Sequence, residues 1–120
     1  MIYNLIHIFS YNNISICIDP YLSDSVEDLL GSKYKRQIPI YDNIKVLSTL
    51  DWILITHDHL DHCDPETISK LLEYSPKAKI VGPSSVWKVL NAIGVDSDRF
   101  FSSNCKSWLD LGIGLKIIST

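Results

Sequence analysis

The sequence predicts an α/β layered domain, and three features lead to that prediction. The chain opens with a β-hairpin pattern, because LIHIF and ISICI flank YNN and Asn-Asn tolerates the positive φ of a tight turn. Two units follow in which a short, continuous apolar run precedes a helical pattern. Strands that alternate with helices after a β start are typical of an α/β domain.

The composition is that of one folded domain. The 120 residues, 46% of them hydrophobic, suffice for a single core. A net charge of -3 gives no reason to expect a nucleic acid or a membrane surface as partner. The three cysteines show no C-x-x-C spacing, which predicts reduced thiols. With neither a signal peptide nor a membrane span recognised, we expect a cytoplasmic protein.

The elements before the first buried strand follow from local signals. The hairpin should end at Asp19 and Pro20, because proline cannot donate to a strand ladder. Residues 21–49 are expected to form a long excursion with a short helix at 26–30, and excursions of this length are usually functional or mobile. The run LDWILIT then predicts a strand that is buried on both faces.

A helix should begin directly after the polar stretch that follows this strand. Asp64 is the expected N-cap, with Pro65 at the first helical position and Glu66 near the positive end of the helix dipole. The helix should end at Ser75, and its apolar face should comprise Ile68, Leu71 and Leu72.

The last third of the sequence continues the alternation. AKIVG predicts a second buried strand, and Ser84 or Ser85 is expected to cap a helix that stops at Gly94. The stretch RFF is a candidate short strand, and SWLDLGIGLKIIS predicts a hairpin with a glycine-containing turn.

Four candidate metal ligands lie within six residues between the buried strand and the capped helix. In an extended segment His57 and His59 project to the same side, where two imidazoles can bind one cation at about 2.0–2.1 Å each. A turn at Leu60 would offer Asp61 and His62 to a second cation. Two metals about 3.5–4 Å apart can share a hydroxide, as in binuclear hydrolases. We therefore predict a metal site, with a solvated polar loop as the alternative.

The segment THDHLDH has the H-x-H-x-D-H form of the metallo-β-lactamase superfamily, which the chain resembles. ICIDPYLSDS, LDWILITHDHLDHCDPETI and KIVGPSSVWKVLNAIGV, in this order, resemble the branch that contains L-ascorbate-6-phosphate lactonase and related cytoplasmic hydrolases. The resemblance covers residues 14–120 and implies an αββα sandwich. Residues 1–120 would be the N-terminal half of that domain, a mixed sheet with helices on one face, and the second half would be absent.

The resemblance also implies roles for individual residues. His57 and His59 would bind the first metal, and Asp61 and His62 the second, with Asp61 also orienting the bridging hydroxide. Asp19 would accept a hydrogen bond from the motif histidines and so orient them, because a ligating imidazole usually gives its other N–H to a carboxylate. A simple turn residue before Pro20 remains the alternative for Asp19. Zn²⁺ and Mn²⁺ both accept such ligands.

The function implied is that of a metal-dependent hydrolase, lactonase-like, acting on a small-molecule ester, lactone or phosphorylated substrate. A phosphodiesterase or nuclease of the same fold is one alternative, although the acidic balance disfavours nucleic acid. A noncatalytic half-domain is the other. With two protein ligands for each metal, the chain alone should hold metal loosely and catalyse poorly. A homo-oligomer or a second-half chain would cover its apolar sheet face.

The remaining polar candidates are given structural interpretations. Cys63 should point away from the metal into packing, Asp58 should make a loop hydrogen bond, and His7 should be a strand histidine. The basic residues of the long excursion should form a solvated face, with contact to a substrate phosphate as the alternative; they are Lys33, Lys35 and Arg36.

Overall fold

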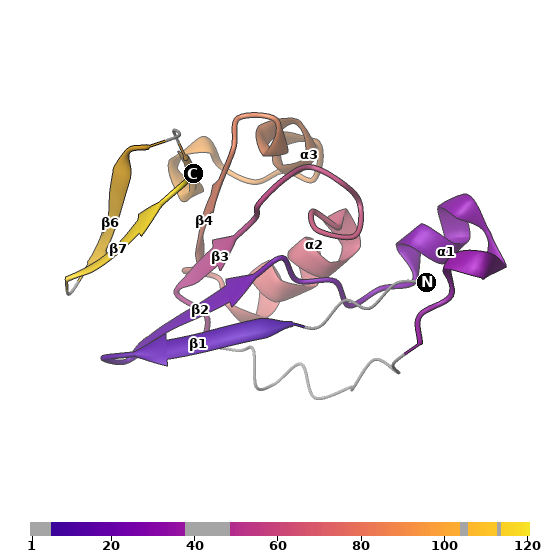
Figure 1. Cartoon of the computed structure of the whole chain (residues 1–120), viewed down its shortest axis with the longest axis horizontal. Helices are drawn as coiled ribbons and strands as arrows, with labels where there is room; N and C mark the ends of the chain where they lie inside the picture. The colour runs from indigo at the N-terminus through magenta and orange to yellow at the C-terminus, as the bar shows by residue number, and fades with distance from the viewer. Residues whose placement is uncertain (1–5, 38–48, 104–105, 113) are drawn as a thin grey trace.

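A five-stranded mixed sheet forms the centre of the molecule (Figure 1). The computed structural model describes residues 6–37, 49–103, 106–112 and 114–120. Within these ranges the central sheet has the order β1-β2-β3-β4-β5, and β6 pairs with β7 in a separate hairpin. The strands are β1 (His7–Tyr11), β2 (Ile14–Ile18), β3 (Trp52–Leu54), β4 (Lys79–Gly82), β5 (Phe100–Ser102), β6 (Trp108–Gly112) and β7 (Leu115–Ile118).

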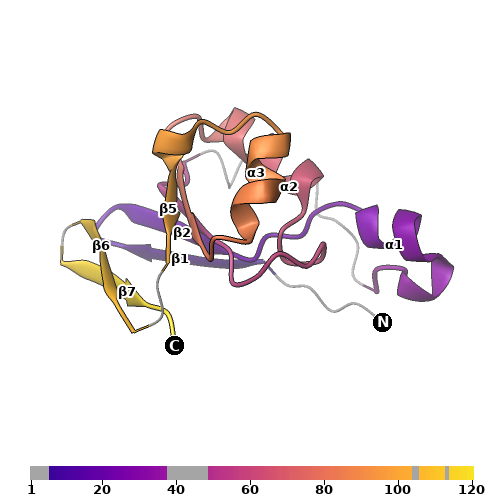
Figure 2. The same ribbon diagram turned by 90° about the horizontal axis from the view of Figure 1, so that it is seen from above.

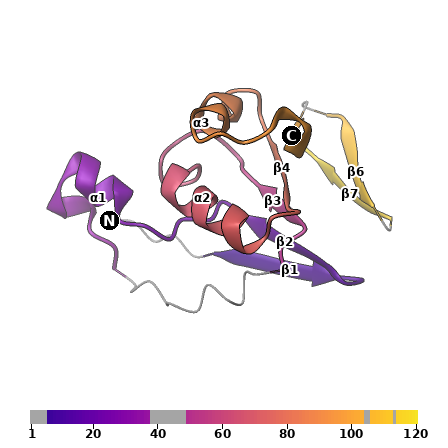
Figure 3. The ribbon, with the colours of Figure 1, turned by 180° about the vertical axis from the view of Figure 1, so that it is seen from behind.

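Helices cover one face of this sheet, and the β6–β7 hairpin lies on the other (Figure 2). The helices are α1 (Ser25–Leu30), α2 (Pro65–Tyr74) and α3 (Val86–Ala92), with short 3₁₀ turns η1 (Ser32–Tyr34) and η3 (Ser97–Arg99). Seen from behind, α2 and α3 lie across the sheet, whereas α1 stands beyond its end (Figure 3). The predicted α/β fold, a mixed sheet with helices on one face, is confirmed.

The strand directions bring the functional segments to one edge of the sheet. The β1–β2 hairpin is antiparallel and turns through Asn12 and Asn13, whose φ values of 47° and 63° are the positive ones that the Asn-Asn pair predicted. From β2 to β5 all neighbours are parallel, with Ile18 beside Leu54 and Leu54 beside Val81. The segments that follow β2, β3 and β4 therefore emerge side by side.

Strand β3 is covered on both faces, as its continuous apolar run predicted. Ile53 faces the helices and packs in a core that includes Ile68 of α2 and Leu90 of α3. Trp52 and the partly buried Leu54 face the hairpin side, in a second core to which β6 and β7 contribute. The layers are thus helix, sheet and hairpin.

The helix boundaries agree with the sequence except at one cap. The Asp64 side chain caps α2 by accepting a hydrogen bond of 3.1 Å from Thr67 N. Gly94 follows α3 with a φ of +81°, as expected of a C-terminal stop. The expected serine cap of α3 is not formed: Ser85 is the N-cap residue but makes no side-chain cap hydrogen bond. Its backbone is already helical, whereas a capping side chain needs an extended backbone.

Two further sequence expectations concern the surface and the excursion. The helix predicted at 26–30 is α1, which begins at Ser25, while residues 38–48 of the excursion lie outside the described ranges. Phe9, Tyr11 and Trp108 are more than half exposed, so apolar surface remains open on β1 and on the hairpin.

No helix in the described part of the chain combines the length and the apolar character that crossing a membrane requires.

Candidate metal centre

The H-x-H-x-D-H motif occupies a tight loop between β3 and α2. Ile55 continues the line of β3 by donating to Val81 O at 2.8 Å, and the loop follows from Thr56 to Asp64. His62 N and Cys63 N both donate to His59 O, at 2.9 and 2.7 Å. This turn folds the second half of the motif back on the first, as the sequence predicted for the position around Leu60.

Asp19 joins the end of β2 to the start of this loop. Its backbone has a φ of +44°, a left-handed conformation that aspartate tolerates better than most residues. Its N–H donates to Leu54 O at 2.9 Å. Its carboxylate accepts from Thr56 twice, Oδ1 from the backbone N at 2.7 Å and Oδ2 from the hydroxyl at 2.6 Å. Asp19 is therefore more than a turn residue before Pro20.

The same carboxylate orients His62. His62 Nδ1 lies 3.0 Å from Asp19 Oδ2. Because an ionised carboxylate only accepts hydrogen bonds, Nδ1 carries the hydrogen. In the tautomer with its hydrogen on Nδ1, the ring has its lone pair on Nε2, which is the atom available to a cation.

Thr56 relays this arrangement to His57. The Thr56 hydroxyl has one hydrogen, which it donates to Asp19, and its oxygen lies 2.8 Å from His57 Nδ1. That oxygen must therefore accept from Nδ1, which leaves His57 Nε2 as the free lone pair. Thr56 was missed in the sequence; its position directly before the motif, between a buried strand and the first histidine, was the available signal.

The motif side chains gather around these two histidines. Among the described residues, Asp19, His57 and His62 each place a potential ligand atom within 4.8 Å of the others. The rings of His57 and His62 have centroids 4.0 Å apart, and the ring of His59 lies 4.6 Å from that of His57. Asp61 Oδ2 is 3.5 Å from His62 Nε2. His59 and Asp61 thus lie beside the group of three rather than within it.

The donor set suits a divalent cation. It combines imidazole nitrogens whose other ring nitrogen is committed to a hydrogen bond with carboxylate oxygens, the pattern found around protein-bound metals. The Asp19 oxygens already accept hydrogen bonds from Thr56 and His62, which favours a supporting position for Asp19. Which residues ligate a metal stays a prediction.

Cys63 lies beside the motif but packs into the core. Its side chain is buried with Ile68 and Leu71. Burial, followed by the negative charges of nearby carboxylates, raises the pKa of this thiol from 9.0 to about 12. A thiol of that pKa is protonated at neutral pH, so the packing interpretation is favoured over a thiolate ligand.

The other candidates lie on the surface, with one correction. His7 on β1 and Asp58 in the loop are exposed, as are Lys33 and Lys35. The interpretation of Arg36 as part of a solvated basic face is wrong, because its side chain is only 9% exposed. The side chain is held against the protein because it donates to two backbone carbonyls of the segment that follows β2.

The chain matches the beta-lactamase superfamily domain over residues 15–102, which run from the second residue of β2 to the end of β5 and include the whole motif loop. The chain belongs to the β-lactamase superfamily. The expected resemblance is confirmed at this level.

Relatives of this superfamily domain are longer proteins. One is an N-acyl-phosphatidylethanolamine-hydrolyzing phospholipase D of Caenorhabditis elegans, 26% identical over 87 residues, which are 71% of this chain and 24% of that protein. Uncharacterised proteins of Mycobacterium tuberculosis and Mycobacterium bovis are 31% identical over 86 residues, 70% of this chain and 22% of theirs. The chain therefore spans about a quarter of the length of the curated relatives it matches.

A solved structure shows the same fold. The metal-soaked Flv1 flavodiiron core from Synechocystis superposes with a TM-score of 0.57 over 92% of this chain and 26% of that one. At 21% sequence identity this likeness shows the metallo-β-lactamase fold alone.

Proposed function

We propose that this superfamily domain provides the H-x-H-x-D-H side of the active site of a metal-dependent hydrolase. One observation carries the proposal. Nδ1 of both His57 and His62 is engaged in a hydrogen bond, which leaves Nε2 of each ring available to a cation, and the ring centroids lie 4.0 Å apart. Such preorganisation is what a ligating histidine needs.

The ligands in this proposal are His57, His59, Asp61 and His62, with Zn²⁺ or Mn²⁺ as the metal. A bound divalent cation lowers the pKa of water and polarises the bond under attack. Asp61 would orient the attacking water by accepting its hydrogen bond. Asp19 and Thr56 would hold the two histidines in the ligating tautomer.

Two substrate classes are proposed in order. The first is a lactone or other carboxylic ester, because the order of the motifs resembles that of the lactonase branch. A phosphodiester is the second candidate, and the similarity to a phospholipase D that hydrolyses N-acyl-phosphatidylethanolamine favours it. Because a hydrolytic water can attack carbon or phosphorus, a substrate panel must separate the two.

The test measures metal retention and turnover together. The purified chain is loaded with Zn²⁺ or Mn²⁺, dialysed against dilute chelator, and assayed with a lactone, a nitrophenyl ester and a nitrophenyl phosphodiester. The same assays follow after adding a polypeptide that carries the remainder of a superfamily domain, taken from a mycobacterial relative.

We expect the chain alone to lose its metal and to hydrolyse at the background rate. The second polypeptide should raise both metal retention and turnover, and Asp61→Asn should lower turnover in the complex. A stable complex that keeps its metal but hydrolyses none of the panel would support a noncatalytic binding domain instead. Rapid hydrolysis by the chain alone would mean that unidentified residues complete the site.

A further inference from the structure

The segment from Asp19 to Ser25, here called the brace, contacts the loop from Thr56 to Asp64, here called the metal loop, at every second residue. Asp19 binds Thr56 and His62 near the start of the brace. Tyr21, which is buried, packs in a small cluster that includes Leu60 in the middle of the motif. Ser23 and Ser25 reach Asp64 at the end of the loop. The contacts therefore run from Asp19 at the end of β2 to Ser25 at the first residue of α1.

Asp64 is the anchor at the far end. This carboxylate is fully buried, and Ser23 Oγ donates to its Oδ2 at 2.6 Å while Ser25 Oγ donates to its Oδ1 at 3.0 Å. Thr67 donates to the same carboxylate through its backbone N and its hydroxyl. The N-cap of α2 is thereby tied to the brace as well as to its own helix.

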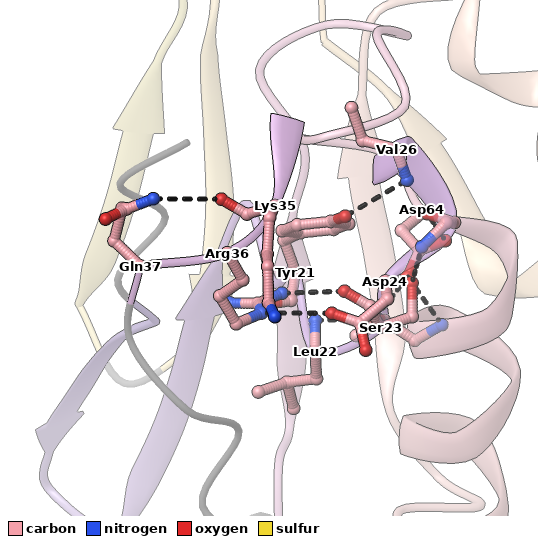
Figure 4. A network of polar contacts seen from close by, with 11 residues as sticks. Tyr21, Leu22, Ser23, Asp24, Val26, Lys35, Arg36, Gln37 and Asp64 are labelled. Atoms are coloured by element: carbon pink, nitrogen blue, oxygen red, sulfur yellow. Dashed lines mark hydrogen bonds and ion pairs between the residues drawn. The ribbon is translucent and has the colours of Figure 1, made fainter. Parts of the chain in front are cut away.

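Arg36 contacts the brace on the side opposite Asp64 (Figure 4). Its Nη2 donates to Tyr21 O at 2.9 Å and to Ser23 O at 2.8 Å, and its guanidinium lies 4.4 Å from the centroid of the Tyr21 ring. The Tyr21 hydroxyl accepts from Val26 N at 3.1 Å, which joins the brace to α1. Among the described residues no strand pairs with the brace, so Arg36 supplies its carbonyls with donors in place of a strand ladder.

We propose that Arg36 and the brace set the geometry of the metal loop, so that Arg36 is a positioning residue for a cation it does not touch. The inference rests on the proposed metal binding. Loss of Arg36 leaves Tyr21 O and Ser23 O without these donors and frees the brace. The hydrogen bonds that Asp19 accepts from Thr56 and His62 and the packing of Tyr21 on Leu60 then weaken together. Residues that orient ligands typically change metal affinity by about 10–100-fold when lost.

The chain offers a matched control in Arg99. Like Arg36, Arg99 binds backbone carbonyls, with Nε and Nη2 donating to Ala78 O at 3.0 and 2.7 Å. Ala78 lies between α2 and β4, and its carbonyl has no part in the brace. Arg36→Gln and Arg99→Gln remove the same chemistry from two places. Ser23→Ala is a milder variant that removes one hydrogen bond between the brace and Asp64.

Two measurements are made on each variant of the chain. The first is amide hydrogen exchange of residues 57–63 without metal, and the second is Zn²⁺ affinity by competition with a chromophoric chelator. We expect Arg36→Gln to speed exchange in the loop and to weaken Zn²⁺ binding by about tenfold. Arg99→Gln should change neither, even where it lowers global stability. Ser23→Ala should also speed exchange in the loop and weaken Zn²⁺ binding. If Arg36→Gln does not fold, Ser23→Ala provides the test instead.

The outcomes separate the two proposals. The role of the brace is overturned if folded Arg36→Gln shows the same loop exchange and the same Zn²⁺ affinity as the wild type. If Arg36→Gln does not fold, the same result in Ser23→Ala overturns it. Equal effects of Arg36→Gln and Arg99→Gln would also overturn it, because they would show general destabilisation. If the wild-type chain binds no Zn²⁺ even with the second polypeptide present, the proposed function fails. Exchange in the metal-free chain still decides whether Arg36 and the brace order the loop.

Discussion

Asp19 and His62 lie 43 positions apart in the sequence and are joined by a hydrogen bond of 3.0 Å between Oδ2 and Nδ1. The same Asp19 oxygen accepts from the Thr56 hydroxyl, which in turn accepts from His57. One carboxylate therefore determines the tautomer of two histidines. It reaches both because the left-handed backbone of Asp19 turns the chain out of the sheet next to the end of β3.

Replacing a motif histidine should remove metal binding. We expect His57→Ala and His62→Ala each to weaken Zn²⁺ or Mn²⁺ binding by far more than about tenfold, since ligand loss exceeds the effect of losing an outer partner. His7→Ala is the matched control, because His7 is an exposed histidine of β1. Isothermal titration of the three variants measures the effect. Equal affinity in His7→Ala and His57→Ala would refute the proposed ligands.

Asp19→Asn should weaken metal binding while leaving the fold intact. Asparagine tolerates the positive φ at this position, so the backbone is not strained. Its amide N–H₂ would face His62 Nδ1, which then must accept, and the hydrogen moves to Nε2. We expect about 10–100-fold weaker Zn²⁺ binding. Nitrogen-15 NMR of the imidazoles reports the tautomer directly.

Asp51→Asn is the control for this change. Asp51 accepts from Ser15 N at 2.8 Å and precedes β3, so it offers a comparable backbone contact at the other end of that strand. It should leave metal affinity unchanged. An Asp19→Asn variant with the wild-type His62 tautomer would show that Asp19 does not orient this ring.

Asp64→Ala should destabilise the chain more than the loss of an ordinary cap. A lost N-cap costs about 0.5–2 kcal/mol, and each buried donor left unpaired adds about 1–3 kcal/mol. Because Ser23, Ser25 and Thr67 all donate to Asp64, we expect the free energy of unfolding in urea to fall by more than about 2 kcal/mol. Asp96→Ala should be nearly neutral, since Asp96 precedes η3 without a side-chain cap. A neutral Asp64→Ala variant would mean that the buried network contributes nothing.

The two buried thiols should be unreactive until the chain unfolds. Cys17 and Cys63 are free and buried, and burial is the main cause that raises the pKa of each from 9.0 to about 12. In a Cys105→Ser background, a thiol reagent at pH 8 should modify neither thiol in buffer and both in urea. Rapid labelling of the native chain would show that these side chains are accessible.

The same pKa shift predicts alkaline destabilisation. The folded chain retains thiol protons that the unfolded chain releases above about pH 9, so the free energy of unfolding should fall as the pH rises from 9 toward 12. Below pH 9 both states are protonated, and this contribution does not change with pH. A Cys17→Ala variant should show a shallower alkaline decline in urea titrations at each pH.

Local chemistry in the sequence was enough to predict most elements and the motif loop. The Asn-Asn turn, the cap at Asp64 and the stop at Gly94 depend on the conformations that individual residues prefer, and such preferences can be read without the fold. The continuous apolar run of β3 likewise shows that both its faces are covered. The spacing of His57, His59, Asp61 and His62 indicated a metal site because few other roles group these residue types.

Only the tertiary structure determined which residues hold the motif histidines in place. Thr56 acquires its role only when the parallel pairing of β2 with β3 brings Asp19 within reach of its hydroxyl. Arg36 looked like a surface cation because charge and sequence neighbours say nothing about which backbone carbonyls a long side chain will meet. Those carbonyls, of Tyr21 and Ser23, are available to it because the segment between β2 and α1 pairs with no strand in the described part of the chain. Contacts of this kind depend on where the chain returns in space, which no local pattern encodes.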